Sequence, residues 1–293
     1  MQKLSDIGKI KEILNKYGFS FSKALGQNFL VNPSVCPRMA ELGGAKKGVG
    51  VIEVGPGIGV LTCELAQRAE RVVAVELDKR LLPVLEETLA EFDNVKVVND
   101  DILKIDLHKL IEDELDGLDV VVCANLPYYI TSPVIMKLLE DRLPVKSITV
   151  MVQKEAADRL CAPLGTRQTG AVTAAVNYYA NAEMLFKVSS GSFMPPPKVD
   201  SAVIKLTLHD NPTVDVTSEE MLFRVIKASF AQRRKTILNT LSATLGISKP
   251  ELSEILKKAG VSQTARAEQL QLSDFASIAN ELYGADNIKN SKM

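Results

Sequence analysis

Short runs rich in β-branched residues alternate with longer helical stretches between about residues 49 and 152. The expected strands cover 51–54, 71–76, 95–98, 120–123 and 148–152. The expected helices cover 60–69, 78–92 and 132–140. Two parallel strands need a connection that crosses one face of the sheet, and a helix is its usual form. The alternation therefore predicts an α/β fold, with a mostly parallel sheet covered by helices on both faces.

The second half of the chain departs from this alternation. Residues 184–188 and 202–208 predict two strands joined by the proline-rich stretch SFMPPPKVD. Because no helix separates them, we expect an antiparallel addition at the edge of the sheet. Successive short helices then follow, and their expected ends are marked by serine N-caps and terminal glycines: Ser218, Ser273, Gly246, Gly260 and Gly284. We therefore expect a catalytic domain over 1–208 and a small all-α domain over 209–293.

Composition narrows the class of protein. No apolar run approaches the ~20 residues of a membrane helix, and the amphipathic, charged N-terminus does not resemble a signal peptide. We therefore expect a cytoplasmic protein that does not bind a membrane. The four cysteines form no CxxC pair, so neither a zinc site nor a disulfide framework is indicated, and we expect no metal.

Basic residues gather in two places, although the net charge is only −1. The N-terminal segment 1–27 is rich in lysine and includes Lys23, and a second cluster is Arg233, Arg234 and Lys235. Both could contact nucleic-acid phosphates, because the local distribution of charge matters more than its sum. The alternative is a pair of solvated surfaces, with the second cluster at a helix start and paired to Glu219 or Glu220.

The tetrapeptide Asn125-Leu126-Pro127-Tyr128 follows directly on the apolar run 120–124. It places an amide, a rigid turn and an aromatic ring at the carboxyl end of a strand, where open α/β sheets bind their ligands. An amide oxygen can accept a hydrogen bond from an exocyclic amine, while a ring stacks on the face of a nucleobase. The alternative is a plain turn, since Asn and Pro are common turn residues.

Three earlier strand ends also carry residues suited to a ligand. The first is followed by Gly55-Pro56-Gly57-Ile58-Gly59, whose glycines would let the backbone approach the ligand closely. Glu76 ends the second strand and could accept hydrogen bonds from both ribose hydroxyls of an adenosine-containing ligand. Asp101 follows the third strand and could accept the adenine amine, or it could instead cap a helix.

Several separated motifs together resemble a known family. They are LGQNFL (25–30), EVGPGIG (53–59), VELD (75–78), NDDIL (99–103), NLPYYI (125–130), FMPPPKVDSAV (193–203) and FAQRRKT (230–236). Their order and identity resemble the ribosomal RNA adenine N6,N6-dimethyltransferases, which are class I methyltransferases that use S-adenosylmethionine. The resemblance implies a Rossmann-like class I methyltransferase sheet. The chain's length and its helical C-terminal part are similar to the bacterial small-subunit members of that family.

The resemblance implies roles for the matching positions. Gln27, Asn28 and Leu30 would close over the cofactor, Gly55 and Gly57 would line its methionine part, Glu76 would bind the ribose, Asp101 the adenine, and Asn125 would lie between the donor methyl group and the target amine. The Asn125 oxygen and the Leu126 carbonyl would accept hydrogen bonds from adenine N6. Tyr128 would stack on the target adenine. Phe193 would cover its other face or form the pocket wall, unless it is only a core aromatic.

These roles imply an enzyme that dimethylates two adjacent adenosines in a hairpin loop near the 3′ end of 16S rRNA. The implied partner is this RNA, in the small subunit or its precursor, with Lys23, Arg233, Arg234 and Lys235 as candidate RNA contacts, and we expect a monomer. One alternative is a 23S rRNA adenine methylase that confers macrolide resistance. The other is a non-catalytic ribosome assembly or transcription factor on the same fold.

Overall fold

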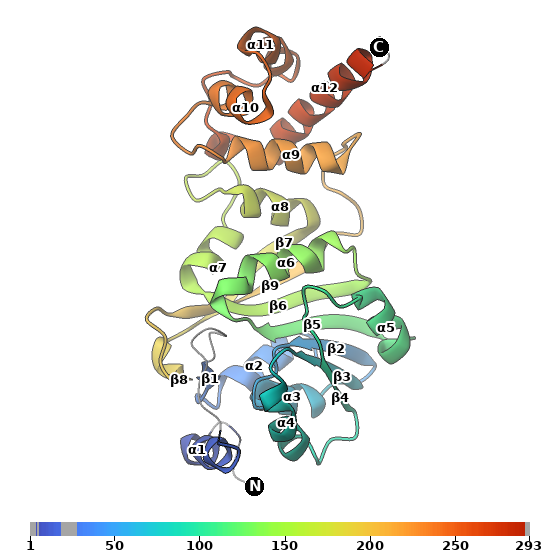
Figure 1. The fold of residues 1–293 in the computed structure, drawn as a ribbon, viewed down its shortest axis with the longest axis vertical. Coiled ribbons are helices and arrows are strands. Elements are labelled where there is room, and N and C mark those ends of the chain that lie inside the picture. Colours follow the sequence, from blue (N-terminus) through green and yellow to red (C-terminus); the bar gives the residue numbers. More distant parts are fainter. Residues whose placement is uncertain (1–3, 5, 19–27, 291–293) are drawn as a thin grey trace. The chain divides into compact units, whose positions relative to one another are not determined.

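The computed structural model of the 293-residue chain describes residues 4, 6–18 and 28–290, with side chains as far as residue 285 (Figure 1). The chain divides into two compact units. The first comprises residues 1–157 and 182–208, and the second comprises 158–181 and 209–293. None of the described helices is both long and apolar enough to cross a membrane.

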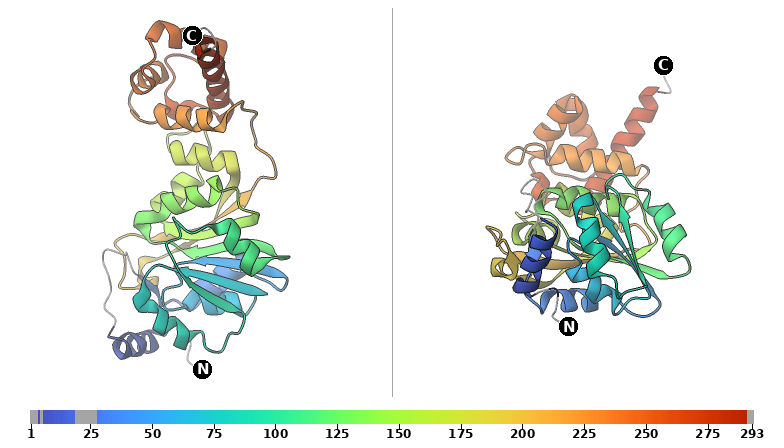
Figure 2. Two further views of the ribbon diagram at one scale, coloured as in Figure 1. Left: turned by 45° about the vertical axis from the view of Figure 1, so that its right-hand side comes forward. Right: turned by 60° about the horizontal axis from the view of Figure 1, so that its bottom comes forward.

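A seven-stranded sheet in the order β4-β3-β2-β5-β6-β9-β7 organises the first unit (Figures 1 and 2). Its strands are β2 (Val49–Val54), β3 (Arg71–Glu76), β4 (Val95–Asn99), β5 (Asp119–Asn125), β6 (Val145–Gln153), β7 (Ala180–Val188) and β9 (Ser201–Leu208). The pairs that join β4, β3, β2, β5 and β6 are parallel, and β9 runs antiparallel to β6. The expected α/β fold with an antiparallel addition is therefore confirmed, and β7 is the outermost strand.

Helices cover both faces of the sheet, because successive side chains of a strand point to opposite faces. On one face, Val49 and Val51 of β2 share a core with buried residues of α2 (Val35–Leu42) and α3 (Val60–Ala66). On the other face, α5 (Leu107–Leu115) lies so close to β2 that a Cβ atom on Gly50 would be 2.9 Å from Leu115 Cδ2. Neither α2 nor α5 was expected from the sequence.

The helix expected over 78–92 is shorter and irregular. A 3₁₀ turn (Lys79–Leu81) leads into α4, which covers only Leu82–Thr88. Asp78 caps the turn by accepting a hydrogen bond from the Arg80 backbone N–H at 3.1 Å. Pro83 stands in the first turn of α4, where its missing N–H leaves no helical hydrogen bond unmade. The α4 face packs against α1 (Ile7–Lys16), another helix that the sequence pattern did not predict.

Several shorter elements complete the first unit. The strands β1 (Phe29–Leu30) and β8 (Phe193–Met194) form an antiparallel ribbon in which Leu30 pairs with Phe193. A 3₁₀ turn over Tyr128–Ile130 joins β5 to α6 (Thr131–Glu140), and α7 (Lys154–Leu160) follows β6 directly. The ribbon matters because it lies beside the carboxyl end of the sheet, where it contributes to the site described below.

The second unit is helical. It contains α8 (Ala171–Tyr179), α9 (Glu219–Ser229), α10 (Ile237–Leu245), α11 (Lys249–Lys258), a 3₁₀ turn (Ala267–Gln269) and α12 (Leu272–Asn290). Aromatic contacts join α8 to α9, since the rings of Tyr179 and Phe223 stack with centroids 5.4 Å apart. In addition, the Tyr178 hydroxyl donates a hydrogen bond to Glu219 at 2.8 Å. These contacts explain why residues 158–181, which lie between β6 and β7 in the sequence, cluster with the C-terminal helices.

Most helix ends in this unit carry the expected signals. The Ser218 side chain accepts a hydrogen bond from the Met221 backbone N–H, and Gly246 and Gly260 adopt φ angles of 72° and 73°. The expectation that a helix ends at Gly284 was wrong, because α12 continues to Asn290. A glycine inside a helix costs about 1 kcal/mol relative to alanine, which weakens the helix without ending it when the following residues remain helical.

Candidate active site

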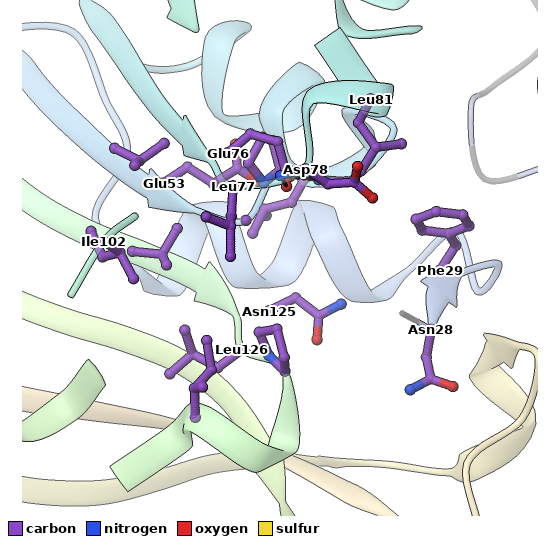
Figure 3. A pocket seen from close by; sticks show the side chains of 18 of the residues that line it. Asn28, Phe29, Glu53, Glu76, Leu77, Asp78, Leu81, Ile102, Asn125 and Leu126 are labelled. Atoms are coloured by element: carbon purple, nitrogen blue, oxygen red, sulfur yellow. Dashed lines mark hydrogen bonds between the residues drawn. The ribbon is translucent and has the colours of Figure 1, made fainter. Parts of the chain in front are cut away.

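A pocket opens at the carboxyl ends of β2, β3 and β5, beside the loop that follows β4 (Figure 3). The strand β2 pairs with β3 on one side and with β5 on the other, so the order of the sheet reverses at this point. Open α/β sheets bind ligands at such a switch point, because the loops on either side diverge and leave a crevice. Every residue that lines the pocket belongs to the first unit.

The glycine loop after β2 forms one wall of the pocket. Gly55, Gly57 and Gly59 have φ angles of 68°, 62° and 92°, a region that side chains disfavour. A Cβ atom on Gly57 would also lie 3.2 Å from the Phe29 ring. The loop therefore needs glycine for its backbone conformation and, at Gly57, for the close approach of an aromatic ring.

Glu76 ends β3 and is held by the backbone on both sides. One carboxylate oxygen accepts a hydrogen bond from the Gly57 N–H at 3.3 Å, and the other accepts one from the Asp78 N–H at 2.8 Å. Burial raises the pKa of Glu76, and the two hydrogen bonds act in the opposite direction. The Asn99 amide donates to the Glu76 carbonyl at 2.7 Å, so the ends of β3 and β4 are tied together.

Glu53 is a second buried carboxyl group in the pocket wall. It is only 1% exposed, and its Oε2 atom accepts no hydrogen bond from the described residues. Burial raises its pKa to about 8, and the nearby charge of Glu76 adds to this shift. The sequence reasoning gave this residue no role, although an acidic residue immediately before the glycine loop was the available signal.

Asp101 and the N-terminal segment border the pocket at two other points. One Asp101 oxygen accepts a hydrogen bond from the Leu103 N–H at 3.0 Å, so this carboxylate caps a turn and also lines the pocket. Asn28 and Leu30 line the pocket next to the β1–β8 ribbon, whereas Gln27 lies outside the described residues. Phe29 also lines it, and the sequence reasoning had not singled out this residue.

Asn125 is the last residue of β5, and its side chain extends into the space bordered by Asn28 and Phe29 (Figure 3). Its amide makes no hydrogen bond with any residue in the described part of the chain. The next residue, Leu126, has a buried side chain, and its N–H donates to the Met151 carbonyl at 3.2 Å. This hydrogen bond to β6 therefore fixes the turn at which Asn125 and Leu126 both line the pocket.

Aromatic side chains flank the Asn125 end of the pocket. Tyr128 is half-buried, and its hydroxyl lies 2.8 Å from the hydroxyl of the fully buried Ser201. Burial raises the pKa of Tyr128, so its phenol is neutral at physiological pH. Phe193 lines the pocket and also packs into the core of the first unit, while Tyr129 lines the rim with 54% of its surface exposed.

The candidate basic cluster at 233–235 does not line this pocket. Arg233, Arg234 and Lys235 are exposed in the turn between α9 and α10, which belongs to the second unit. The Arg233 guanidinium donates a hydrogen bond to the Arg167 carbonyl at 3.3 Å. Lys23 lies outside the described residues. The structure thus brings together the candidate residues from the four strand ends and the β1–β8 ribbon, without the cluster at 233–235.

The chain is similar to known proteins over nearly its whole length. The family model described as ribosomal RNA adenine dimethylase matches residues 18–283. The ribosomal RNA small subunit methyltransferase A of Alkaliphilus oremlandii is 48% identical over 283 residues, which cover 96% of this chain and 99% of that protein.

Two solved structures share the fold. A dimethyladenosine transferase from Plasmodium falciparum superposes with a TM-score of 0.73 at 26% identity, covering 88% of this chain and 98% of that one. The 23S rRNA methyltransferase ErmE superposes with a TM-score of 0.66 at 27% identity, covering 87% and 100%. The resemblance seen in the sequence motifs is therefore confirmed: the chain belongs to the ribosomal RNA adenine dimethylase family and is an S-adenosylmethionine-dependent methyltransferase.

Proposed function

We propose that this chain transfers methyl groups from S-adenosylmethionine to N6 of two adjacent adenosines in a hairpin loop near the 3′ end of 16S rRNA. The observation that carries this proposal is the pairing of the Asn125–Leu126 turn with the glycine loop and Glu76 in one pocket. The 48% identical relative is a small subunit methyltransferase, which favours the small subunit over the 23S alternative, whose solved representative is 27% identical. The intact polar groups of the pocket argue against a non-catalytic assembly or transcription factor.

The pocket residues fit this cofactor. Glu53 offers a buried carboxyl oxygen without a hydrogen-bond partner among the described residues, which suits a positively charged ligand. Gly55 and Gly57 leave the backbone open to close approach. When bound, S-adenosylmethionine supplies a methyl group already activated by its attachment to a sulfonium, so no metal or strong base is needed to make the group electrophilic.

Other side chains would hold the rest of the cofactor. Glu76 is placed by two backbone hydrogen bonds, so its oxygens would meet the ribose hydroxyls at little cost in side-chain entropy. Asp101 would accept the adenine amine while it keeps its bond to the Leu103 N–H. Asn28 and Leu30, together with Gln27, would close the pocket from the N-terminal side, and Asn125 would border the methyl group.

The turn at Asn125 would activate the target amine by hydrogen bonding. Adenine N6 is a weak nucleophile because its lone pair is delocalised into the ring. The Asn125 amide oxygen and the Leu126 carbonyl would each accept one N6 hydrogen, which favours the tetrahedral amine and directs its lone pair at the methyl group. A neutral amide cannot take up the proton at pH 7, so Asn125 acts by orientation rather than as a base.

Aromatic residues would hold the extruded base. Tyr128 would stack on the adenine, a contact worth roughly 1–3 kcal/mol per base, and Phe193 would cover the other face or form the wall. Tyr128 is held by Ser201, and Phe193 is held by its pairing with Leu30 in the β1–β8 ribbon. A second methyl transfer to the same amine would require space around N6 in this pocket.

The remaining parts of the proposal concern the whole chain. Residues 1–208 would form the catalytic domain, except that 158–181 cluster with the helical unit, and residues 209–293 would form the RNA-binding domain. Lys23, Arg233, Arg234 and Lys235 would contact RNA phosphates, a kind of contact that fixes position without reading sequence. The protein would act as a cytoplasmic monomer on 16S rRNA in the small subunit or its precursor.

The decisive experiment incubates the protein with labelled S-adenosylmethionine and three substrates: free 16S rRNA, undermethylated small subunits and 23S rRNA. We expect two adjacent dimethylated adenines near the 3′ end of 16S rRNA, mapped by mass spectrometry. Methylation confined to 23S rRNA would replace the proposal with the resistance-type activity. The variant Asn125→Ala is the control: it should reduce transfer by 100-fold or more and change cofactor affinity by less than about fivefold.

A further inference from the structure

A second hollow in the first unit lies outside the candidate active site. Its polar lining comes from the segment after β1, from α2 and from the end of β7: Asn32, Ser34, Arg38, Lys187, Ser189 and Ser192. We call it the α2–β7 hollow. Two of its side chains are cationic and three carry hydroxyl groups. A cavity with this lining suits a small anion rather than an apolar group.

Arg38 makes a cation–π contact with an aromatic residue of the hollow. Its guanidinium carbon lies over the Phe186 ring, 4.2 Å from the ring centroid. A guanidinium that stacks on a ring uses its face, while its five N–H groups point outward in its own plane. The stacking thus fixes the side chain in advance and reduces the entropy lost when a ligand binds.

Neither cation of the hollow forms an ion pair with another residue in the part of the chain that the structure describes, and the nearest carboxylate that the hydrogen bonds place beside the lining is Asp200, which accepts from the Ser190 N–H at 2.9 Å. The ion pairs of the first unit involve other residues, and both Arg38 and Lys187 are exposed. Two positive charges in one hollow repel each other, and a bound anion would relieve that repulsion. An anion at this place would therefore be attracted by both charges at once.

Hydrogen bonds order the polar groups between the two cations. The Asn32 amide donates to the Ser192 hydroxyl at 3.2 Å and accepts from the Ser34 hydroxyl at 2.8 Å. The Ser34 backbone N–H also donates to the Asn32 side chain at 3.1 Å. Asn32 therefore holds a serine on each side of it in place.

The hollow and the active-site pocket share the β1–β8 ribbon. Leu30 and Phe193 line the pocket, whereas Asn32 and Ser192, one or two residues away, line the hollow. The Val31 and Asn32 N–H groups both donate to the Ser192 carbonyl, at 2.9 and 3.4 Å, which makes the ribbon continuous at this point. The lining of the hollow therefore lies within one or two residues of the lining of the pocket along both strands of the ribbon.

From these observations we propose that the α2–β7 hollow binds a backbone phosphate of the substrate RNA, adjacent to the nucleotide whose base enters the active-site pocket. This inference rests on the proposed function, because it names a contact for the same substrate. Arg38 would bind the phosphate with two N–H groups, Lys187 would add a point charge, and the Ser189 and Ser192 hydroxyls would donate further hydrogen bonds, since the Ser34 hydroxyl already donates to Asn32. Such a contact would set which nucleotide reaches the pocket.

The test compares Arg38→Gln and Lys187→Gln with Lys47→Gln, a variant with the same charge change at an exposed lysine outside the hollow. RNA binding would be measured over a range of salt concentrations with a hairpin from the 3′ end of 16S rRNA. We expect each hollow variant to weaken binding about three- to tenfold and to lower the salt slope by up to ~0.7, the value for one single-strand phosphate. Cofactor affinity should stay unchanged.

A second arm identifies the ligand as a particular RNA phosphate. Two hairpins would each carry one neutral methylphosphonate, on one or the other side of the target adenine. We expect only one of these two positions to weaken binding to the unmodified protein. The same substitution should cost Arg38→Gln much less, because the contact is already lost. If inorganic phosphate binds in the hollow without competing with RNA, the hollow is a site for the free anion, and the RNA assignment is overturned.

Salt slopes equal to that of Lys47→Gln, and equal methylphosphonate effects in both proteins, would overturn the proposal. Arg38→Gln could disturb the Phe186 ring, but Lys187→Gln leaves that stacking intact and decides the matter alone. A protein that binds the hairpin through the hollow but methylates no 16S rRNA would refute the proposed function and leave the phosphate site standing.

Discussion

The hydroxyl groups of Tyr128 and Ser201 lie 2.8 Å apart at the edge of the pocket. Tyr128 belongs to the turn after β5, and Ser201 is the first residue of β9. Ser201 is completely buried, whereas Tyr128 is only half-buried. A half-buried ring would otherwise sample several orientations. The contact therefore makes Ser201 a positioning residue for the ring that would stack on the target adenine.

We predict that Ser201→Ala raises the KM for RNA about three- to tenfold, with a smaller change in kcat and no change in cofactor affinity. The reason is that the ring stays in place on average but loses the bond that orients it, a loss of about 1 kcal/mol. Steady-state kinetics with RNA as the varied substrate would measure this. Tyr128→Phe keeps the ring and removes the same bond, so it should match Ser201→Ala; a much larger effect of Ser201→Ala would indicate a packing role.

Glu53 leads to a prediction about pH. Its pKa is raised to about 8 by burial in the folded protein, above its usual value of 4.5. The folded state therefore binds this proton more tightly than the unfolded state, so its stabilising contribution is lost as pH rises from about 4.5 to about 8. In the absence of cofactor, we expect Glu53→Gln to flatten this decline, with a gain on the order of 2–5 kcal/mol at pH 8 relative to the parent chain.

Chemical denaturation at several pH values between 5 and 8 would measure this effect. Glu76, whose pKa is also raised by burial, retains a smaller slope of the same sign in the variant. Above pH 8, where Glu53 of the parent chain is ionised, the same variant should bind S-adenosylmethionine more weakly, because an amide cannot offer a negative charge to a cationic ligand. Parallel stability curves for the two proteins would show that Glu53 is ionised in the folded state.

At the scale of elements, the glycine loop between β2 and α3 depends on a backbone shape that few residues adopt. Gly57 has a φ angle of 62°, and a Cβ atom there would lie 3.2 Å from the Phe29 ring. Gly48 precedes β2, has a φ angle of 78°, and has open space around its missing Cβ. Both positions have a positive φ angle, which alanine disfavours, but they differ in what surrounds the missing Cβ atom.

We predict that Gly57→Ala and Gly48→Ala each lose about 1 kcal/mol of stability, since alanine is disfavoured at positive φ. Only Gly57→Ala should also weaken cofactor binding, by tenfold or more, because the new methyl group displaces Phe29 or the loop. Thermal unfolding and calorimetric titration with S-adenosylmethionine would separate the two effects. Equal cofactor affinities in the two variants would show that the loop tolerates a side chain and does not need close approach.

At the scale of the whole molecule, residues 158–181 belong to the helical unit although they lie between two strands of the sheet. Tyr178 and Tyr179 are buried and pack against Phe223 of α9. The pocket, in contrast, is lined only by residues of the first unit. The chain therefore leaves the first unit after residue 157 and returns to it at residue 182, yet all residues that line the pocket come from the first unit.

We predict that a chain truncated after Leu208 keeps cofactor affinity within about fivefold but loses RNA methylation. It should also expose the segment 158–181, because Tyr178 and Tyr179 lose the ring of Phe223 and Tyr178 loses the Glu219 carboxylate. Limited proteolysis and mass spectrometry would detect the new cleavage sites. In the full-length chain, Phe223→Ala is the matched control and should expose the segment only in part; full protection of 158–181 after truncation would contradict the packing argument.

Much of the sheet was predictable, because period-two and helical patterns are local properties of the chain. The runs at 71–76 and 95–98 match β3 and β4 to within one residue, whereas the strand expected over 120–123 extends to Asn125 as β5. The short helices α2 and α5 were missed because their patterns span only two turns. The end of α12 was misjudged because Gly284 is tolerated inside a helix.

By itself, the sequence determined the order of strands and helices, the glycine loop and the motifs that place the chain in its family, because each depends on neighbouring residues. Only the tertiary structure showed that Glu53 is buried, with its Oε2 atom unpaired among the described residues, that Ser201 holds Tyr128, and that Arg38 lies over the Phe186 ring. Burial and contacts between distant segments depend on how the sheet is assembled. No local pattern encodes them, so they had to be found in the fold.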